Sequence, residues 1–315
     1  MDSSESDEVK PVFVALLGPT ASGKSALALQ LATTFGLEIV NCDSRQVYLD
    51  MQIGTASPTL QEQQLISHHL FNFLSPSLTF SAADYADTAA IAIRKIWKAG
   101  KIPLLAGGTG FYYAALSEGL GDAGHDEGRA TELCQIAEQS GHAHMVELLL
   151  SLDPKAAAVV DTNNLRRVLR AIEIVERTGR PFCENVPVPT LPEAEFFPMV
   201  VTRSRPILHA SIETRIDRMI ADGLEAEVRS LVAKYGRDAG GLNAIGYREW
   251  LAYFDGITTI EAVRNEIIIH TRQYAKRQET WFRRRPGIPP VDIDSPEEHS
   301  AILRKTAAFL KKFGV

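Results

Sequence analysis

The chain has 315 residues, of which 45% are hydrophobic and 23% charged, a composition typical of a globular protein that buries a core. No apolar run approaches the roughly 18–20 residues of a membrane-spanning helix, and residues 1–10 are acidic and polar rather than a secretory signal. These features argue against a membrane or secreted protein, and we expect a cytoplasmic chain with a disordered tail over 1–10. The three cysteines are too widely spaced to indicate a disulfide framework or a zinc site.

Charge is distributed unevenly along the chain. The formal net charge is −6, yet residues 264–285 contain seven basic and two acidic side chains, a local charge of +5, so the remainder carries −11. A basic element on an acidic body is suited to contacts with a nucleic-acid backbone. A solvated charged surface would give the same pattern, so both interpretations stay open.

The first third of the chain alternates strands and helices. An apolar strand over residues 12–18 precedes a glycine-rich loop and a helix, and a second strand stops near Asp43. A helix follows from a Ser81 cap to Gly100, and "KIPLLAGGTG" predicts a third strand that ends in a glycine-rich turn. This alternation predicts an α/β fold with a parallel sheet. Polar loops at the carboxyl ends of its strands should converge on one cleft.

The first of these loops, "GPTASGKS" over 18–25, has the spacing of a phosphate-binding loop. Its backbone N–H groups and the amino end of the next helix would face an anion, Lys24 adds a positive charge, and the Ser25 hydroxyl suits Mg²⁺. The spacing does not say whether the phosphate is a fuel, a donated group or a leaving group.

Other candidates in the cleft have competing explanations. Asp43 could accept a proton from a substrate, or it could cap the next helix. The glycines of 106–110 could admit a ligand, with Thr109 donating to a phosphate oxygen, or could form only a tight turn. His68 and His69 lack a third residue spaced to join them as metal ligands, which favours packing or capping roles.

The pattern changes to helical after Gly119. We expect a helical insertion over 120–196 within a core made of 11–119 and 197–315, with a strand returning near Phe196 and mostly helices from Ser211 onward. A basic C-terminal helix should present Arg272, Lys276 and Arg283 on one face. The packed face opposite should hold Val263, Ile267, Tyr274 and Trp281.

Taken in order, these motifs resemble the tRNA dimethylallyltransferase (tRNA isopentenyltransferase) family from about residue 12 to 285. The shared set includes "GPTASGKS", "DSRQVYLDMQIGTASP", "FSAADY", "GKIPLLAGGTGFYYAAL", "LRRVLRAIEI", "RIDRMIADGLEAEV", "LNAIGYRE" and "TRQYAKRQETWFRR". A phosphate loop alone is common, whereas this ordered set is specific. The resemblance implies a P-loop NTPase-like parallel sheet core, an all-helical insertion that contacts tRNA and a helical C-terminal region.

The resemblance also implies a reaction. A dimethylallyl group would pass from dimethylallyl diphosphate to N6 of the adenosine beside the anticodon (position 37) in tRNAs that read codons beginning with U. The diphosphate would be the leaving group, with Mg²⁺ as cofactor, in a monomeric enzyme that binds the anticodon stem-loop. Asp43 occupies the family's position for the proton acceptor, and Thr20, Thr109 and Arg215 match positions for diphosphate binding or transfer. The diphosphate-binding residues would be Gly18, Pro19, Thr20, Ala21, Ser22, Gly23, Lys24 and Ser25, with Ser25 as the metal ligand.

The family's tRNA-contacting positions map onto four segments and one threonine. They are Asp43, Ser44, Arg45, Gln46, Thr109, Arg166, Arg167, Val168, Leu169, Arg170, Asn243, Ala244, Ile245, Gly246, Tyr247, Arg248, Lys276, Arg277, Gln278, Glu279, Thr280, Trp281, Phe282 and Arg283. Three alternatives stay open: an isopentenyltransferase for free adenine nucleotides, an ATP-dependent small-molecule kinase, and a noncatalytic RNA-binding module.

Overall fold

A computed structural model describes residues 11–120 and 126–314, and the tail expected over 1–10 lies outside the described residues. The chain divides into two compact units. The α/β unit comprises the residues up to Leu116 and from Leu191 onward, and the helical unit comprises Ser117–Thr190. The helical unit thus differs in its bounds from the insertion expected over 120–196. Residues 191–196 belong to the α/β unit because they lead into one of its strands.

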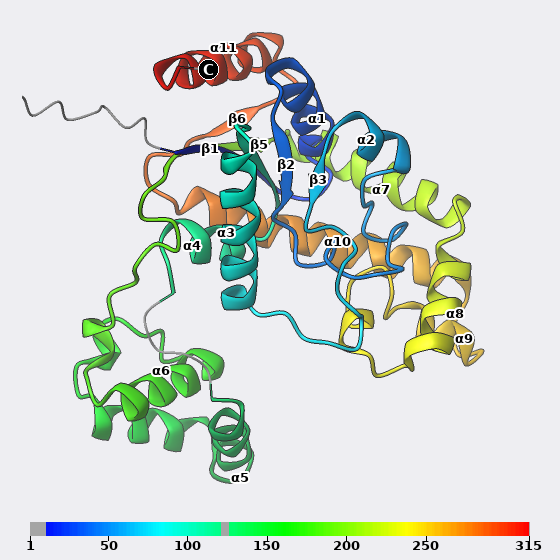
Figure 1. The fold of residues 1–315 in the computed structure, drawn as a ribbon. Helices are drawn as coiled ribbons and strands as arrows, with labels where there is room; N and C mark the ends of the chain where they lie inside the picture. The colour runs from blue at the N-terminus through cyan, green and yellow to red at the C-terminus, as the bar shows by residue number, and fades with distance from the viewer. Residues whose placement is uncertain (1–10, 121–125, 315) are drawn as a thin grey trace, which may run out of the picture. The chain divides into compact units, whose positions relative to one another are not determined.

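The α/β unit contains a parallel sheet (Figure 1) whose strand order is β3-β2-β4-β1-β5-β6. The sequence predicts four of these strands, and their positions are confirmed. It does not predict β3 and β6, because strands of two and three residues are too short to show a period-two pattern. The strands are β1 Val12–Leu17, β2 Glu38–Asn41, β3 His68–His69, β4 Pro103–Gly107, β5 Glu195–Thr202 and β6 Pro290–Asp292.

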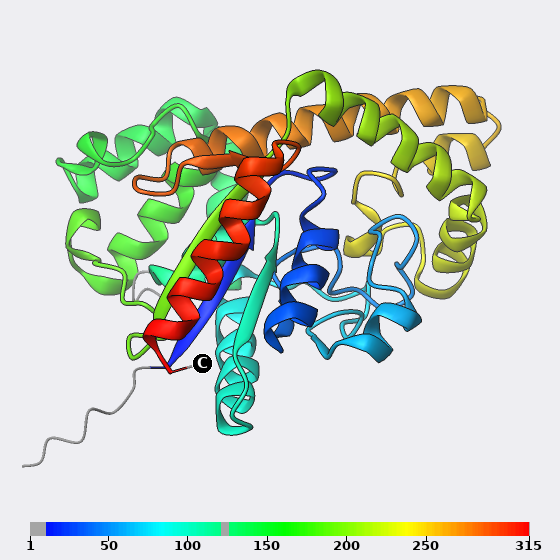
Figure 2. The ribbon, with the colours of Figure 1, turned by 90° about the horizontal axis from the view of Figure 1, so that it is seen from above.

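Both faces of β1 are buried, as expected for an inner strand of a parallel sheet. Phe13, Ala15 and Leu17 belong to one core cluster and their neighbours Val12, Val14 and Leu16 to another, because successive side chains point to opposite faces. Side chains from α3 and α4 complete the first cluster, and side chains from α1 and α11 complete the second. The ribbons of these helices lie alongside the sheet (Figure 2). These helices are α1 Lys24–Phe35, α3 Ala82–Lys98, α4 Gly110–Ser117 and α11 Pro296–Lys312.

Helix α3 begins and ends where the sequence predicts. The Ser81 hydroxyl accepts a hydrogen bond from the Asp84 N–H at 3.1 Å, and the Asp84 carboxylate accepts one from the Ser81 N–H at 2.8 Å. This reciprocal pair satisfies two backbone donors that a helix start leaves free. Gly100 follows the helix with a φ of +69°, a conformation that glycine adopts without strain.

A third core cluster of the α/β unit lies among the C-terminal helices. Trp250 and Tyr247 are buried there with Val47 and Met51, which follow β2. Helix α10 contributes Val263 to this cluster. In the last turn of the same helix, Phe282 belongs instead to the cluster that contains Phe13 on one face of the sheet. The remaining helices of the unit are α2 Leu60–Leu65, α7 Arg205–Ala221, α8 Leu224–Tyr235, the 3-10 turn Gly240–Leu242, α9 Trp250–Phe254 and α10 Ile260–Arg283.

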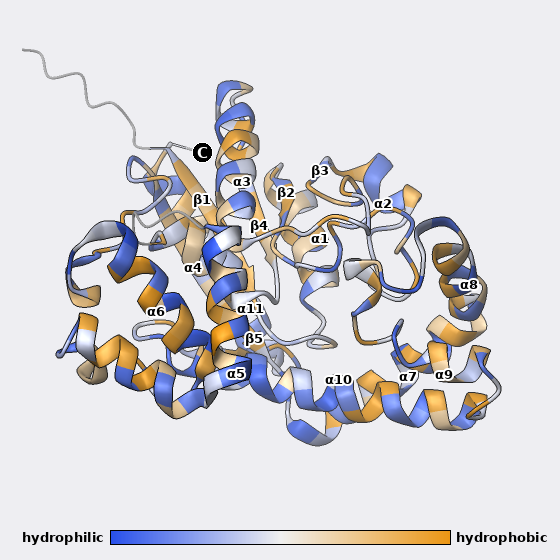
Figure 3. Ribbon diagram, turned by 90° about the horizontal axis from the view of Figure 1, so that it is seen from below, coloured by the Kyte–Doolittle hydropathy of each residue, from blue (hydrophilic) through white to orange (hydrophobic). Residues whose placement is uncertain are grey.

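The helical unit is held by an apolar core between α5 (Glu127–Leu152) and α6 (Leu165–Thr178). Hydrophobic and hydrophilic residues are interspersed along α6 (Figure 3), and buried positions such as Val168, Ala171, Ile172 and Val175 recur three or four residues apart, as in an amphipathic helix. Gly141 departs from helical geometry and divides α5 into two segments. Two 3-10 turns complete the unit, Ala156–Ala158 and Phe182–Glu184.

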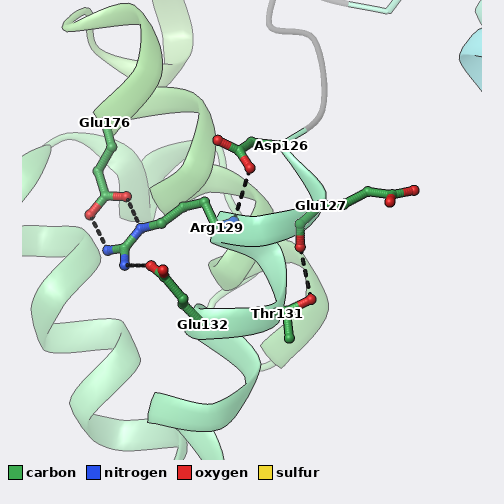
Figure 4. Close-up of polar contacts among 6 residues, drawn as sticks. All are labelled: Asp126, Glu127, Arg129, Thr131, Glu132 and Glu176. Atoms are coloured by element: carbon green, nitrogen blue, oxygen red, sulfur yellow. Dashed lines mark hydrogen bonds and ion pairs between the residues drawn. The ribbon is translucent and has the colours of Figure 1, made fainter.

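A polar cluster at the start of α5 joins the two helices (Figure 4). The Arg129 guanidinium donates to both carboxylate oxygens of Glu176 on α6, at 2.8 and 2.7 Å, and to Glu132 at 2.9 Å. The Asp126 carboxylate caps α5 by accepting from the Arg129 N–H at 3.0 Å. The bidentate pair fixes the orientation of one helix against the other.

In the described part of the chain, no helix has both the length and the apolar character needed to cross a membrane.

Candidate active site

The glycine-rich loop of residues 18–25 joins β1 to α1, the strand–loop–helix context that the sequence predicts. Gly23 has a φ of +85°. This conformation favours glycine, and a Cβ at the position would also lie only 2.6 Å from the end of the Ile293 side chain, which would have to move. The Lys24 ammonium donates to the Pro19 carbonyl at 3.1 Å, which folds the lysine over its own loop.

The loops after β2 and β4 meet the phosphate loop at the same edge of the sheet. The Thr109 N–H donates to the Cys42 carbonyl at 3.1 Å, and the Ser44 N–H donates to the Thr109 hydroxyl at 2.9 Å. A Cβ at Gly107 would lie 2.0 Å from the Cys42 carbonyl oxygen. Gly107 therefore makes room for the neighbouring backbone, as the tight-turn interpretation of residues 106–110 predicts, and it also lines the first of the cavities described below.

Asp43 lies in a turn directly after β2. Its carboxylate accepts from the Arg45 N–H at 2.9 Å, and its own N–H donates to the Asn41 side chain at 2.8 Å. The next helix, α2, begins only at Leu60. Asp43 therefore stabilises a turn rather than a helix start, and the helix-cap alternative is wrong.

Two cavities adjoin this cluster and share four residues: Thr20, Asp43, Thr55 and Arg215. The first cavity, of about 90 Å³, is also bordered by Lys24, Ser25, apolar groups that include Ile39 and Phe71, and polar groups that include Gln46 and His68. The second cavity, of about 290 Å³, is also bordered by the loop of residues 243–248 and by Tyr274 and Arg277 of α10. A group beside Asp43 can thus be reached from two sides.

Burial alters the acidity of the groups around this junction. Burial lowers the pKa of Lys24 to about 8. The negative charge of Asp43 raises this pKa in part, and the positive charge of Arg215 lowers it. Burial also lowers the pKa of Arg215, with Asp43 again opposing the shift. The Arg215 guanidinium donates to the Thr55 carbonyl at 3.1 Å. The junction therefore holds two poorly solvated cations for which an anion would be a favourable partner.

Gln278 of α10 ties two of the loops together. Its side-chain oxygen accepts from the Thr20 N–H at 2.9 Å, and its side-chain nitrogen donates to the Gly108 carbonyl at 2.8 Å. The side chain is buried. Gln278 falls in a segment predicted to contact tRNA, but nothing in the sequence identifies its backbone partners 258 and 170 residues away.

Glu227 of α8 is a residue to which the sequence analysis assigned no role, although it lies within the shared motif "RIDRMIADGLEAEV". Its carboxylate accepts from the N–H groups of residues 52, 53 and 54 at 3.0, 2.7 and 3.1 Å, and from the Tyr247 hydroxyl at 2.7 Å. These contacts fix the segment that brings Thr55 to both cavities. The motif marks this position, but the sequence does not show which backbone groups the carboxylate binds.

The basic face predicted for α10 is only partly present. Lys276 and Arg283 are exposed, whereas Arg272 is half-buried and paired with Glu213 of α7. On the opposite face Val263 and Ile267 are buried as predicted. Tyr274 and Trp281 are only partly buried, and the fully packed positions near the end of the helix are Ala275, Gln278 and Phe282.

Helix α6 of the helical unit carries the other predicted basic segment. Arg166 and Arg167 are exposed, and Arg170 pairs with Glu173 at 2.8 Å. Val168 has no exposed surface, so this position cannot offer its side chain to RNA in this conformation. The same is true of Phe282 in α10, whose side chain packs against the sheet.

The two neighbouring histidines make separate local contacts. His69 lies 2.7 Å from the Glu38 carboxylate, and the His68 ring hydrogen bonds to the Ile66 carbonyl at 2.8 Å. Burial lowers the pKa of His68, which favours its neutral form. Among the described residues, no three His, Cys, Asp or Glu side chains gather as a metal site would require.

This chain is similar to known proteins over most of its length. The family model described as IPP transferase matches residues 46–285. A tRNA dimethylallyltransferase of Shouchella clausii is 40% identical over 300 residues, covering 95% of this chain and 96% of that protein. One of Geobacter metallireducens is 40% identical over 307 residues, covering 96% and 99%.

Solved structures show the same fold. A full-length tRNA isopentenylpyrophosphate transferase from Bacillus halodurans is 35% identical with a TM-score of 0.70, and the match covers 97% of this chain and 98% of that one. A eukaryotic dimethylallyltransferase acting on tRNA is 27% identical with a TM-score of 0.75, covering 93% and 78%. On the extent of these matches, the chain belongs to the IPP transferase family.

Proposed function

We propose that the protein is a tRNA dimethylallyltransferase, which transfers a dimethylallyl group from dimethylallyl diphosphate to N6 of the adenosine adjacent to the anticodon. The observation that carries this proposal is the wall shared by the two cavities, which consists of Thr20, Asp43, Thr55 and Arg215. A donor in the first cavity and an acceptor base in the second would meet there. Family membership and the names of the relatives support the same reaction.

The first cavity suits an allylic diphosphate. Lys24 and Ser25 line it together with Arg215, so the diphosphate can lie against the phosphate loop. Ile39 and Phe71 line it as well and can contact the hydrocarbon chain. Positive charge on Lys24 and Arg215 stabilises the diphosphate as it leaves, because the site is poorly solvated and the charges are already in place.

The residues also fit a Mg²⁺ ion. The Ser25 hydroxyl lines the first cavity and is the kind of oxygen ligand that Mg²⁺ prefers. Mg²⁺ commonly completes its shell with phosphate oxygens and water, so it does not need a larger cluster of carboxylates. When bound, the ion neutralises charge on the leaving diphosphate.

Asp43 is placed to serve the acceptor. Its carboxylate borders the second cavity and can orient an adenine N6 amine toward C1 of the donor. The C1–O bond breaks with its electron pair going to the diphosphate, and the N6 lone pair forms the N6–C1 bond. Asp43 accepts the displaced N6 proton, which restores the neutral amine.

The second cavity is suited to a base that has left its stack. Its volume is about 290 Å³, and its wall includes residues 243–248, Tyr274 and Arg277. Enzymes that modify bases offset the cost of unstacking, a few kcal/mol, by contacts to the flanking backbone and a fitted pocket. Exposed cations of α10, Lys276 and Arg283, can supply backbone contacts within the same unit.

The test is incubation of the purified protein with Mg²⁺, labelled dimethylallyl diphosphate and unmodified tRNA. We expect label in the RNA, and mass analysis of its nucleosides should show N6-(dimethylallyl)adenosine. A tRNA with guanosine in place of the target adenosine is the matched control and should stay unlabelled. Prenylation of free adenine nucleotides alone, or phosphate release from ATP without prenylation, would contradict the proposal.

A further inference from the structure

A third cavity lies against the phosphate loop, with a volume of about 210 Å³. It shares Lys24, Ser25 and Arg215 with the first cavity, so these three residues separate the two spaces. Its lining contains three cations and no carboxylate. The lining residues are Ala21, Gly23, Lys24, Ser25, Arg203, Ser211 and Arg215.

Arg203, which follows β5, is the cation that belongs to this cavity alone. It donates to the Ser211 hydroxyl at 3.2 Å and pairs with Asp294, which follows β6, at 3.1 Å. Its Nε is buried and has no hydrogen-bond partner among the described residues. One terminal nitrogen lies 3.3 Å from the place where a Cβ on Gly23 would sit, so the guanidinium rests on the phosphate loop.

We propose that this cavity is a subsite for the terminal phosphate of the diphosphate and that Arg203 is a binding residue in it. The inference rests on the proposed function in one respect, that the loop holds a diphosphate. A diphosphate in contact with Lys24 and Arg215 lies between the first and third cavities, so its terminal phosphate can face Arg203. A planar guanidinium can donate two hydrogen bonds to phosphate oxygens.

Asp294 then acts as an internal competitor for the phosphate. Its carboxylate occupies one donor edge of Arg203, at 3.1 Å, although both side chains remain about one-quarter exposed, at 29% and 25%. Binding of the terminal phosphate exchanges one anion for another at that edge. Removing the charge of Asp294 should therefore strengthen phosphate binding, whereas removing Arg203 should weaken it.

The test is calorimetric titration of the full chain with inorganic pyrophosphate and Mg²⁺ at fixed ionic strength. We expect Arg203→Gln to weaken binding about tenfold, Arg203→Lys to recover part of the loss, and Asp294→Asn to strengthen binding about threefold. Arg205→Gln is the matched control, because Arg205 is an exposed arginine two residues along that does not line the cavity. The Arg205→Gln protein should bind pyrophosphate with the same affinity as the unchanged protein.

Steady-state kinetics supplies a second readout. Arg203→Gln should raise the KM for dimethylallyl diphosphate about tenfold and leave the KM for tRNA unchanged. Equal pyrophosphate affinity in the Arg203→Gln and Arg205→Gln proteins would overturn the inference and assign the ion pair to structure. If Arg203→Gln fails to fold, Asp294→Asn decides the question, since unchanged or weaker binding in that variant is also contrary to the inference.

The same measurements separate the two proposals. Pyrophosphate binding that depends on Arg203 in a protein that does not prenylate tRNA supports the subsite and refutes the proposed function. If the protein prenylates tRNA and Arg203→Gln has no effect on pyrophosphate affinity, the proposed function is supported and the subsite is refuted.

Discussion

The helical unit and the site end of the α/β unit differ in the balance of their buried side chains. The helical unit is built around an apolar cluster, with Leu149, Val168 and Ile172 among its fully buried members, beside two buried carboxylates, Asp153 and Glu173. At the site end, Gln278 and Asn41 are buried, and each hydrogen bonds to backbone groups of two segments. The apolar cluster is stabilised by its area of contact, so a smaller apolar side chain weakens it by degrees. The hydrogen bonds of the site end need particular atoms at particular distances, and removing one partner leaves the other unsatisfied.

Asp43 is the residue on which the site end should depend most. We expect Asp43→Asn to slow prenyl transfer about a thousandfold, because an amide cannot accept the N6 proton and general bases typically contribute 10²- to 10⁴-fold. Single-turnover transfer to tRNA measures the effect, and pyrophosphate titration is the control that should stay nearly unchanged. Transfer within a few-fold of normal would remove the proton-accepting role.

Gln278→Leu tests whether the buried hydrogen bonds of the site end matter as much as its charges. The change leaves the Thr20 N–H and the Gly108 carbonyl without partners, at a cost of about 1–3 kcal/mol each. We expect a lower free energy of unfolding in urea and about a hundredfold slower transfer, because the loops lose their register. Gln273→Leu, at an exposed position of the same helix, should alter neither quantity. If Gln278→Leu and Gln273→Leu had the same free energy of unfolding and the same transfer rate, the buried hydrogen bonds of Gln278 would not be important to the site.

Val168→Ala tests the helical unit in the opposite way. Loss of two buried methyl groups should lower the free energy of unfolding of this unit by about 2 kcal/mol. Pyrophosphate affinity should not change, because Val168 lies in the apolar core of the other unit. Val159→Ala is the matched control, since that valine is 55% exposed and should cost little. A loss of tRNA affinity without a loss of stability would show instead that Val168 contacts RNA.

The surface cations of α10 should contribute through counterion release. Neutralising Lys276 and Arg283 to glutamine should reduce the slope of log affinity for tRNA against log salt by about 1.5, which corresponds to two phosphate contacts. Arg272→Gln should change the slope less, because Arg272 is already paired with Glu213. An equal effect of all three cations would mean that the pair opens when RNA binds.

The smallest effect concerns pH. Because the pKa of Lys24 is about 8 in the folded protein, its charge is lost as pH rises through that value. Pyrophosphate affinity should therefore decline a few-fold above pH 8, and the Lys24→Met protein should bind pyrophosphate weakly at every pH.

The same residue affects stability with the opposite dependence on pH. The unfolded chain retains the lysine proton up to the ordinary pKa of 10.5, so the contribution of Lys24 to the free energy of unfolding rises with pH between about 8 and 10.5. Urea titrations of the unchanged protein and of Lys24→Met at pH 7 and pH 10 measure this contribution. A contribution of Lys24 that fell between the two pH values would contradict the prediction.

The regular elements could be predicted from the sequence because each leaves a local signal. Ser81 and Gly100 mark the ends of α3, and the apolar run over 12–17 marks a strand buried on both faces. The convergence of the phosphate loop with Asp43 followed from the parallel sheet alone. These predictions use only neighbouring residues or the rule that parallel strands end at one edge.

The contacts that complete the site could not be predicted, because they join residues far apart in the chain. The local sequence does not distinguish three of the residues involved from ordinary exposed polar side chains. They are Gln278, Glu227 and Arg203. Their partners are mostly backbone groups or single side chains on other elements. Helical periodicity gave the buried face of α10 correctly at Val263 and Ile267 but not the pairing of Arg272, which depends on α7.

The bond between Gln278 and the Thr20 backbone spans 258 positions of the chain. During translation the phosphate loop is among the first segments to emerge, whereas the glutamine that holds it is among the last. The nascent chain therefore remains without a finished site until synthesis is almost complete. A chain that ended before Gln278 would have the loop and Asp43 but not the residue that fixes their arrangement, so we expect it to show little transfer activity.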